Sequence, residues 1–107
     1  MSVNRQEEGK RGEDLAAEFL RKKGFKVIDR NFRIRGGEID IVALHKGSLV
    51  FIEVKTRSSL EFGSPFEAIT PWKLRALVKT AQFYKLKHPK LPDLMRIDAV
   101  GVQIDYL

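Results

Sequence analysis

Apolar residues along the chain recur at spacings that predict two helices and four strands. The first helix is expected from Glu7 to Lys23 and to stop at Gly24, a residue type that often follows a helix C-terminus. Its apolar stripe is expected to consist of Leu15, Ala16, Phe19 and Leu20. One face of this helix should therefore lie against the rest of the protein.

The second helix is expected to begin at Thr70–Pro71 and to run to about Leu86. Threonine is a favoured N-cap, and proline is favoured at the first helical position. The residues expected on its buried face are Leu74, Leu77, Val78 and Ala81. Trp72, at the start of this helix, is expected to pack against the protein rather than to stack on a base.

Runs of Val, Ile and Phe predict the strands. One strand should begin at Phe25, with an irregularity near Asp29–Asn31, and the last should span Met95–Ile104. Between them lie Ile39–Leu44 and Leu49–Lys55, after which the chain is expected to form a loop. The order helix, three strands, helix, strand predicts a single domain over residues 1–107 of the α/β class, with a mixed central sheet flanked by helices.

The two central runs form a predicted hairpin. A two-residue turn at Lys46–Gly47, or a four-residue loop over His45–Ser48, pairs the strands so that Asp40 lies opposite Glu53, whereas a three- or five-residue loop would not. Side chains alternate along a strand, so Phe51, Glu53 and Lys55 should share one face of the second run. On the first run, Asp40, Val42 and Leu44 should share a face opposite to that of Ile39, Ile41 and Ala43.

Two facing carboxylates inside a sheet are unfavourable unless a cation lies near them. Lys55 can balance one of them, and an ordinary structural ion pair is the alternative interpretation. Because Asp and Glu offer only oxygen ligands, a hard divalent ion such as Mg²⁺ or Mn²⁺ is expected, which can also bind substrate phosphate. Asp40, Glu53 and Lys55 therefore indicate phosphodiester hydrolysis, with Glu38 as a further candidate ligand or only a strand-end residue.

Composition adds a partner and a compartment to this picture. The 107 residues carry a formal net charge of +6 and no cysteine. The positive charge favours a nucleic-acid partner, and the missing thiols exclude thiol catalysis and sulfur-bound zinc. The polar N-terminus and the lack of a long apolar run predict a soluble cytoplasmic protein with no membrane partner.

Several blocks of the sequence resemble a known family. An acid on one strand followed by Glu-x-Lys on the next is similar to the PD-(D/E)xK nuclease core. The ordered blocks resemble the YraN-like family of small bacterial predicted endonucleases; they are GxxGExxAxxFLxxKGF (Gly9–Phe25), RNFRIRGGEIDIVA (Arg30–Ala43), LVFIEVKTR (Leu49–Arg57), FGSPFEAIT (Phe62–Thr70) and RIDAV (Arg96–Val100). Ile39 stands where the motif name has proline.

This resemblance implies a restriction-endonuclease-like fold and a set of site residues. It implies that Asp40, Glu53 and the backbone carbonyl of Val54 hold a Mg²⁺ or Mn²⁺ ion, and that Lys55 acts as catalytic base or electrostatic helper. The family also resembles archaeal Holliday-junction resolvases, which carry an extra glutamate on the first helix. Glu13 matches that position, where the alternative is an exposed charge that only suits the helix N-terminal half.

The implied activity is a metal-dependent endonuclease acting on DNA, including branched or non-standard structures. Candidate contacts to the nucleic-acid backbone are Arg57, Lys73, Arg75 and Lys79, or these are simply solvated side chains. The competing hypothesis is a non-catalytic nucleic-acid-binding module that has kept a nuclease fold. A homodimer would suit paired cuts, although no feature of the sequence indicates one.

Overall fold

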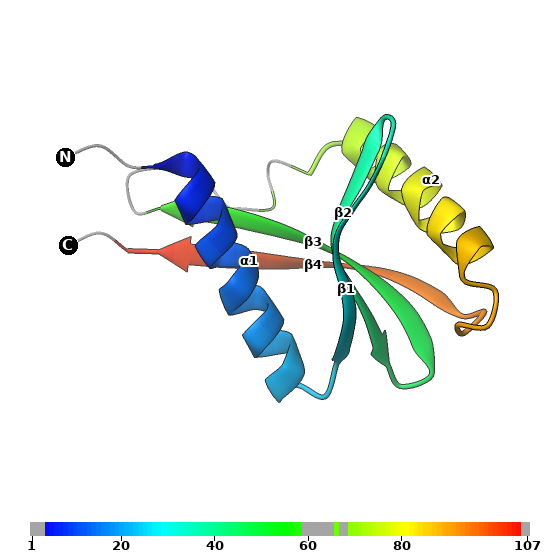
Figure 1. Ribbon diagram of the computed structural model, residues 1–107. Helices are drawn as coiled ribbons and strands as arrows, with labels where there is room; N and C mark the ends of the chain where they lie inside the picture. The colour runs from blue at the N-terminus through cyan, green and yellow to red at the C-terminus, as the bar shows by residue number, and fades with distance from the viewer. Residues whose placement is uncertain (1–3, 59–65, 67–68, 106–107) are drawn as a thin grey trace.

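The computed structural model describes residues 4–58, 66 and 69–105 of the chain. Two helices and four strands follow one another in the predicted order (Figure 1): α1 (Arg5–Lys22), β1 (Lys26–Ile34), β2 (Gly37–His45), β3 (Ser48–Ser58), α2 (Pro71–Lys87) and β4 (Met95–Ile104). The family block at Phe62–Thr70 lies largely outside the described residues. No helix in the described ranges is both long and apolar enough to cross a membrane.

The strands form one mixed sheet in the order β1-β2-β3-β4. β1, β2 and β3 are antiparallel neighbours, whereas β4 runs parallel to β3 after the crossover through α2. The predicted α/β class, with a mixed central sheet flanked by helices, is thus confirmed. The final strand has its predicted bounds, but β3 continues to Ser58, so the loop expected directly after Lys55 begins later than predicted.

A two-residue turn connects β2 and β3, as predicted. His45 pairs with Ser48, and the pairing continues to Ile41 with Ile52. Lys46 and Gly47, between them, both have positive φ angles, of 48° and 79°. Such a turn matches the right-handed twist of the flanking strands. It therefore sets the register on which the acidic positions depend.

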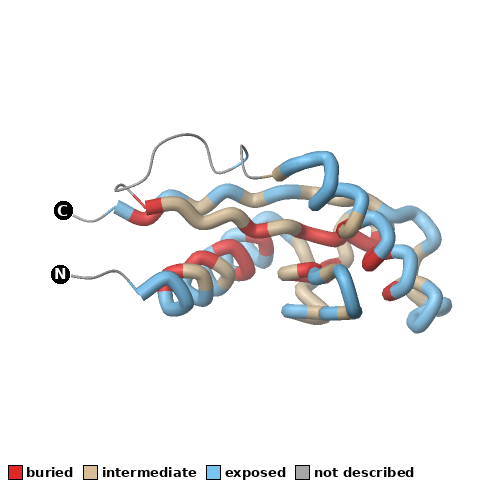
Figure 2. The backbone as a smooth tube through the Cα atoms, turned by 90° about the horizontal axis from the view of Figure 1, so that it is seen from above, coloured by how far each residue is buried: buried red, intermediate tan, exposed pale blue. Residues whose placement is uncertain are grey.

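Each face of the sheet packs against one helix. In Figure 1, α1 crosses β3 and β4, while α2 lies beside β2. The α1 side of the core consists of Ala16, Ala17, Leu20, Ile41, Ala43, Val50, Ile52 and Val54. The α2 side consists of Ile39, Val42, Leu49, Phe51, Leu77, Ala81 and Tyr84. Figure 2 shows these buried positions along the central strands and along the inner side of α1.

The helix faces differ in part from the prediction. Phe19 and Leu74 are 50% and 45% exposed, and Leu15 and Val78 are also exposed, although all four were expected to be buried. Ala17, Thr80 and Tyr84 take buried positions instead. The expected stripes included Phe19 and Leu74, whereas the faces that pack here combine small residues such as Ala17 with larger ones such as Tyr84.

Two glycines allow the helices to approach the sheet closely. A Cβ atom on Gly12 of α1 would lie within 3 Å of three side-chain atoms of Thr56 on β3. A Cβ atom on Gly37 of β2 would collide with the Thr80 hydroxyl oxygen of α2. The buried hydroxyl of Thr80 donates to the Ala76 carbonyl, 2.7 Å away, so it is satisfied within its own helix. These contacts bring both helices close to the acidic end of the hairpin.

Candidate functional site

β2 bends at Asp40. Regular alternation would place Ile39 on the same face as Ile41, but Ile39 packs on the α2 side and Ile41 on the α1 side. The predicted face of Ile39 is therefore wrong. The β1–β2 pairing places Asn31 across from Asp40, and Asn31 has a left-handed φ of 56°, within the irregularity expected near Asp29–Asn31. Asparagine tolerates this conformation better than most residues.

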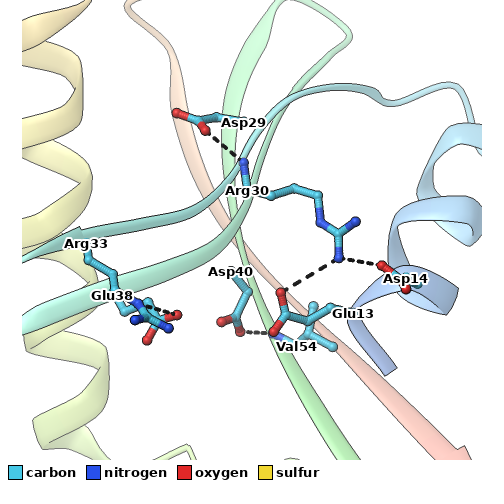
Figure 3. Close-up of polar contacts among 8 residues, drawn as sticks. All are labelled: Glu13, Asp14, Asp29, Arg30, Arg33, Glu38, Asp40 and Val54. Carbon is cyan, nitrogen blue, oxygen red and sulfur yellow. Dashed lines mark hydrogen bonds and ion pairs between the residues drawn. The ribbon is translucent and has the colours of Figure 1, made fainter. Parts of the chain in front are cut away.

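The bend lets the Asp40 side chain take the place of a strand carbonyl. Its Oδ2 accepts a hydrogen bond from the backbone N–H of Val54, 2.7 Å away (Figure 3). The N–H and C=O of one strand residue face the same neighbouring strand. The Val54 carbonyl, which the family resemblance implies as a metal ligand, is therefore expected to face the Asp40 side of β3.

A cavity of about 190 Å³ opens beside Asp40. Its lining combines carboxylates, lysines and two apolar residues of α2: Glu38, Asp40, Glu53, Lys55, Lys73, Ala76 and Leu77. The hairpin register places Asp40 and Glu53 at the positions that follow the Ile41–Ile52 pair. The structure thus brings the predicted trio of Asp40, Glu53 and Lys55 to one cavity.

Lys55 pairs with only one of the carboxylates. Its Nζ lies 3.1 Å from Glu53 Oε1 on the same strand, which is the ion pair of the alternative interpretation. Asp40 forms no ion pair with any other residue that the structure describes. Burial, followed by the charges of Glu53, Glu13 and Glu38, raises the pKa of Asp40 to about 7, against the lowering effect of the Val54 hydrogen bond.

Two lysine side chains of the cavity lining, Lys55 and Lys73, contact each other. Burial lowers the pKa of Lys55, but contact with Lys73 and the charges of Glu53 and Asp40 outweigh it and raise the value. Contact with Lys55 lowers the pKa of Lys73, and burial and Arg57 act in the same direction. Of the two, Lys55 therefore holds its proton more firmly. This favours an electrostatic role over a role as base.

Glu13 reaches toward the site from α1. Figure 3 shows its carboxylate between Asp40 and the Arg30 guanidinium of β1. Arg30 Nη2 lies 3.9 Å from Glu13 and 2.8 Å from Asp14. Burial raises the pKa of Glu13, partly offset by Arg30. Its Oε1 atom is buried and accepts no hydrogen bond from the residues described, so it is not the exposed charge of the alternative interpretation.

The donors present fit a small, hard cation that keeps several waters. One Asp40 oxygen accepts the Val54 N–H, and one Glu53 oxygen forms the ion pair with Lys55. The buried Oε1 of Glu13 accepts no hydrogen bond from the described residues. Mg²⁺ is typically bound by one or two carboxylates together with water and phosphate. Within the described ranges, no three acidic or histidine side chains converge closely enough to form a protein-only metal cage.

The predicted nucleic-acid contacts lie at different distances from the cavity. Lys73 lines the cavity, and Arg57 on β3 is near enough for its charge to lower the Lys73 pKa. The Arg75 guanidinium lies 4.6 Å from the ring centre of Trp72, and Lys79 is exposed on α2. Trp72 is 76% exposed, so the expectation that it packs against the protein is wrong.

Sequence reasoning missed two parts of this site. It placed Lys73 among distant phosphate contacts, although the side chain lies in the cavity beside Lys55. It also gave no role to Arg30, which lies between the carboxylates of Glu13 and Asp14. Asn31 and Asp40 lie between the register pairs Arg30–Ile41 and Phe32–Ile39. The irregularity noted near Asn31 was therefore the available signal that Arg30 would lie at the site.

Fold and site together define a small α/β domain whose sheet carries an acidic, lysine-containing cavity. A family model described as "Uncharacterised protein family UPF0102" matches residues 12–102, and the chain belongs to this family. This agrees with the family resemblance of the sequence blocks. The family description itself assigns no nuclease activity.

Relatives from several bacteria share most of the chain. A UPF0102 protein of Syntrophomonas wolfei is 46% identical over 94 residues, which cover 88% of this chain and 82% of the relative. A UPF0102 protein of Persephonella marina is 45% identical over 94 residues, covering 88% and 81%. A UPF0102 protein of Renibacterium salmoninarum is 50% identical over 96 residues, covering 90% and 81%.

Proposed function

We propose that the protein is a divalent-metal-dependent endonuclease that hydrolyses phosphodiester bonds of DNA, including branched or otherwise non-standard structures. The observation that carries this proposal is the shared cavity of Asp40, Glu53 and Lys55, in which Asp40 lacks an ion-pair partner among the described residues. A half-buried carboxylate without a cation is costly, so its retention in a bent strand calls for a function.

The roles follow from the chemistry of each group. Asp40 and Glu53, with the Val54 carbonyl, would hold a Mg²⁺ or Mn²⁺ ion, and Glu13 would reach it directly or through water. A bound ion of this kind supplies charge neutralisation at phosphate and a lower pKa for water. Lys55, with its raised pKa, would stay charged and attract a phosphate oxygen.

Lys73 can take part in the same reaction. Its ammonium lies beside Lys55, so one of the two gives up a proton more easily than an isolated lysine. Once a phosphate anion enters the cavity, its negative charge favours the protonated form of both side chains. Together they would bind the phosphate within the cavity that both side chains line.

The second candidate is a nucleic-acid-binding module without catalysis. The Lys55–Glu53 ion pair favours it, because a structural pair needs no metal. This candidate predicts salt-dependent DNA binding that is the same with and without divalent ions. It also predicts that Asp40 can be replaced without loss of any function.

A cleavage screen separates the two candidates. Duplex, single-stranded, flapped and four-way DNA would be incubated with the protein in Mg²⁺, Mn²⁺ or EDTA. The endonuclease proposal predicts cleavage of at least one substrate that needs metal and is abolished by Asp40→Ala. Asp105→Ala, which removes an exposed carboxylate just after β4, serves as the charge-matched control.

Calorimetric titration with Mn²⁺ provides a second readout that does not depend on finding the substrate. A site present in the wild-type protein and weakened in Glu53→Gln supports the metal centre, since the amide is a poorer ligand for a hard cation. If Asp40→Ala behaves like wild type in the cleavage screen, and Glu53→Gln behaves like wild type in the titration, the endonuclease is refuted and the binding module remains.

A further inference from the structure

An open basin of about 820 Å³ lies between the N-terminal half of α1 and β1. Its lining comprises four basic side chains, two carboxylates, two amides and a glycine: Arg5, Lys10, Arg30, Arg33, Glu13, Asp14, Gln6, Asn31 and Gly9. The sequence-based expectation put nucleic-acid contacts on α2 and Arg57 instead. Of the residues that line this basin, the proposed reaction uses only Glu13.

The lining is positively charged where it meets solvent. The lining holds four cationic side chains and two carboxylates. Arg30 forms ion pairs with both carboxylates, at 2.8 Å from Asp14 and 3.9 Å from Glu13. Lys10 is exposed on α1, and the Arg33 side chain is 71% exposed, with Glu38 at 3.2 Å as its partner. An exposed pair of this kind contributes little to stability, so Arg33 can exchange Glu38 for a phosphate.

Gly9 gives an independent indication that a ligand approaches the α1 side of the basin. It lies inside α1, where glycine is less stable than alanine. Unlike Gly12, it has no packing reason among the described residues, because none of them would lie within 4 Å of an added Cβ atom. Gly9 lines the basin, and its missing side chain suits the close approach of a ligand backbone.

The basin also leads to the acidic cavity. Glu13 lines the basin, and its charge helps to raise the pKa of Asp40 in the cavity. Arg33 lines the basin, and its partner Glu38 lines the cavity. A chain lying across the basin therefore ends at the carboxylates. Regularly spaced anions match this arrangement better than a single small anion would.

We propose that the α1–β1 basin binds the sugar–phosphate backbone of the nucleic-acid strand that enters the acidic cavity, with Lys10 and Arg33 contacting phosphates and Gly9 letting the backbone approach α1. This inference rests on the proposed function for the identity of the strand. It assigns the path of the substrate to α1 and β1, with Lys55 and Lys73 receiving the phosphate at its end.

The test measures binding without cleavage. Fluorescence anisotropy in EDTA would follow a labelled DNA duplex and its single strand, each over a series of KCl concentrations. The double variant Lys10→Glu/Arg33→Glu should bind at least about tenfold more weakly, and its slope of log K against log salt should fall by roughly 1.4 to 1.8, as expected for two lost phosphate contacts. The matched control is Lys26→Glu/Lys90→Glu, which changes net charge equally at exposed positions outside the basin.

Gly9→Gln tests the close approach separately. Glutamine favours a helix, so the melting temperature should stay the same or rise, while DNA affinity should fall. Equal weakening by the two double variants, or unchanged affinity in Gly9→Gln, would overturn the basin proposal. Failure of the endonuclease looks different, because the basin variants would still weaken binding while wild-type protein cleaves no substrate with Mn²⁺.

Discussion

Replacing Asp40 with asparagine should remove a pH-dependent loss of stability from the metal-free protein. Asparagine keeps the size of the side chain and can still accept the Val54 N–H, so the bend in β2 is retained. It removes only the titrating charge. The comparison therefore isolates the effect of the neighbouring carboxylates and of burial.

The magnitude follows from the shift in pKa. The Asp40 pKa rises from 3.8 to about 7 in the folded protein, so the folded state binds this proton more tightly than the unfolded chain does. The resulting stability is fully present below pH 3.8 and is lost as the pH rises through 7. Between pH 5 and pH 8, the loss is about 2.7 kcal/mol, at 1.36 kcal/mol for each of the two units below the folded pKa.

Urea unfolding in EDTA at pH 5 to 8, followed by circular dichroism, measures this directly. The free energy of unfolding of the wild-type protein should fall relative to that of Asp40→Asn by about 2 to 3 kcal/mol over this range. Asp105→Asn, at an exposed position, should follow the wild type. Adding Mn²⁺ at pH 8 should stabilise the wild type and leave Asp40→Asn unchanged.

If the free energies of unfolding of wild type and Asp40→Asn change in parallel from pH 5 to pH 8, the reasoning is refuted. They would mean that the Asp40 carboxylate is solvated in the folded protein and that its acidic neighbours do not act on it. An opposite slope, with the wild type gaining stability toward pH 8, would mean that a cation of the chain already neutralises it. Either result would remove the main physical support for a metal at this position.

Three further changes test other parts of the structure. Lys55→Met should lower the rate of metal-dependent DNA cleavage by about 10² to 10³, as seen when a transition-state charge contact is removed, with a smaller effect on DNA binding measured in EDTA. Gly12→Ala should destabilise the protein by about 1 to 3 kcal/mol in urea unfolding because its methyl group meets Thr56, whereas Gly9→Ala, with open space, should stabilise it by roughly 0.5 to 1 kcal/mol. Tyr84→Ala should cost about 3 to 5 kcal/mol because the ring is buried against two phenylalanines, and Tyr84→Phe should keep most of that stability, as judged by the same unfolding assay.

The hairpin and the element order could be predicted because their signals are local. The Lys46–Gly47 turn sets the β2–β3 register from two residues, and Thr70–Pro71 marks the start of α2. From these, the meeting of Asp40 with Glu53 and Lys55 at one cavity follows by counting. That part of the candidate site needed no tertiary information.

The remaining features depend on packing that a one-dimensional pattern does not contain. The exposure of Phe19 and Leu74 follows from helices that approach the sheet through small residues such as Gly12. The change of face at Ile39 follows from a strand bend, which breaks the period-two rule on which its assignment relied. The contact between Lys55 and Lys73 joins two elements with no shared sequence signal.

The tight turn at Lys46–Gly47 also makes chain length a property of the candidate site. Deleting one residue there would move every β2 side chain by one place relative to β3 and would turn Asp40 away from Glu53. An inserted residue would do the same unless the tip accommodates it as a three-residue loop. Diverging copies of this protein can therefore change the composition of the hairpin tip more freely than its number of residues. The number of residues between Asp40 and Glu53 sets the pairing of β2 with β3, and the chemistry proposed for the cavity depends on that pairing.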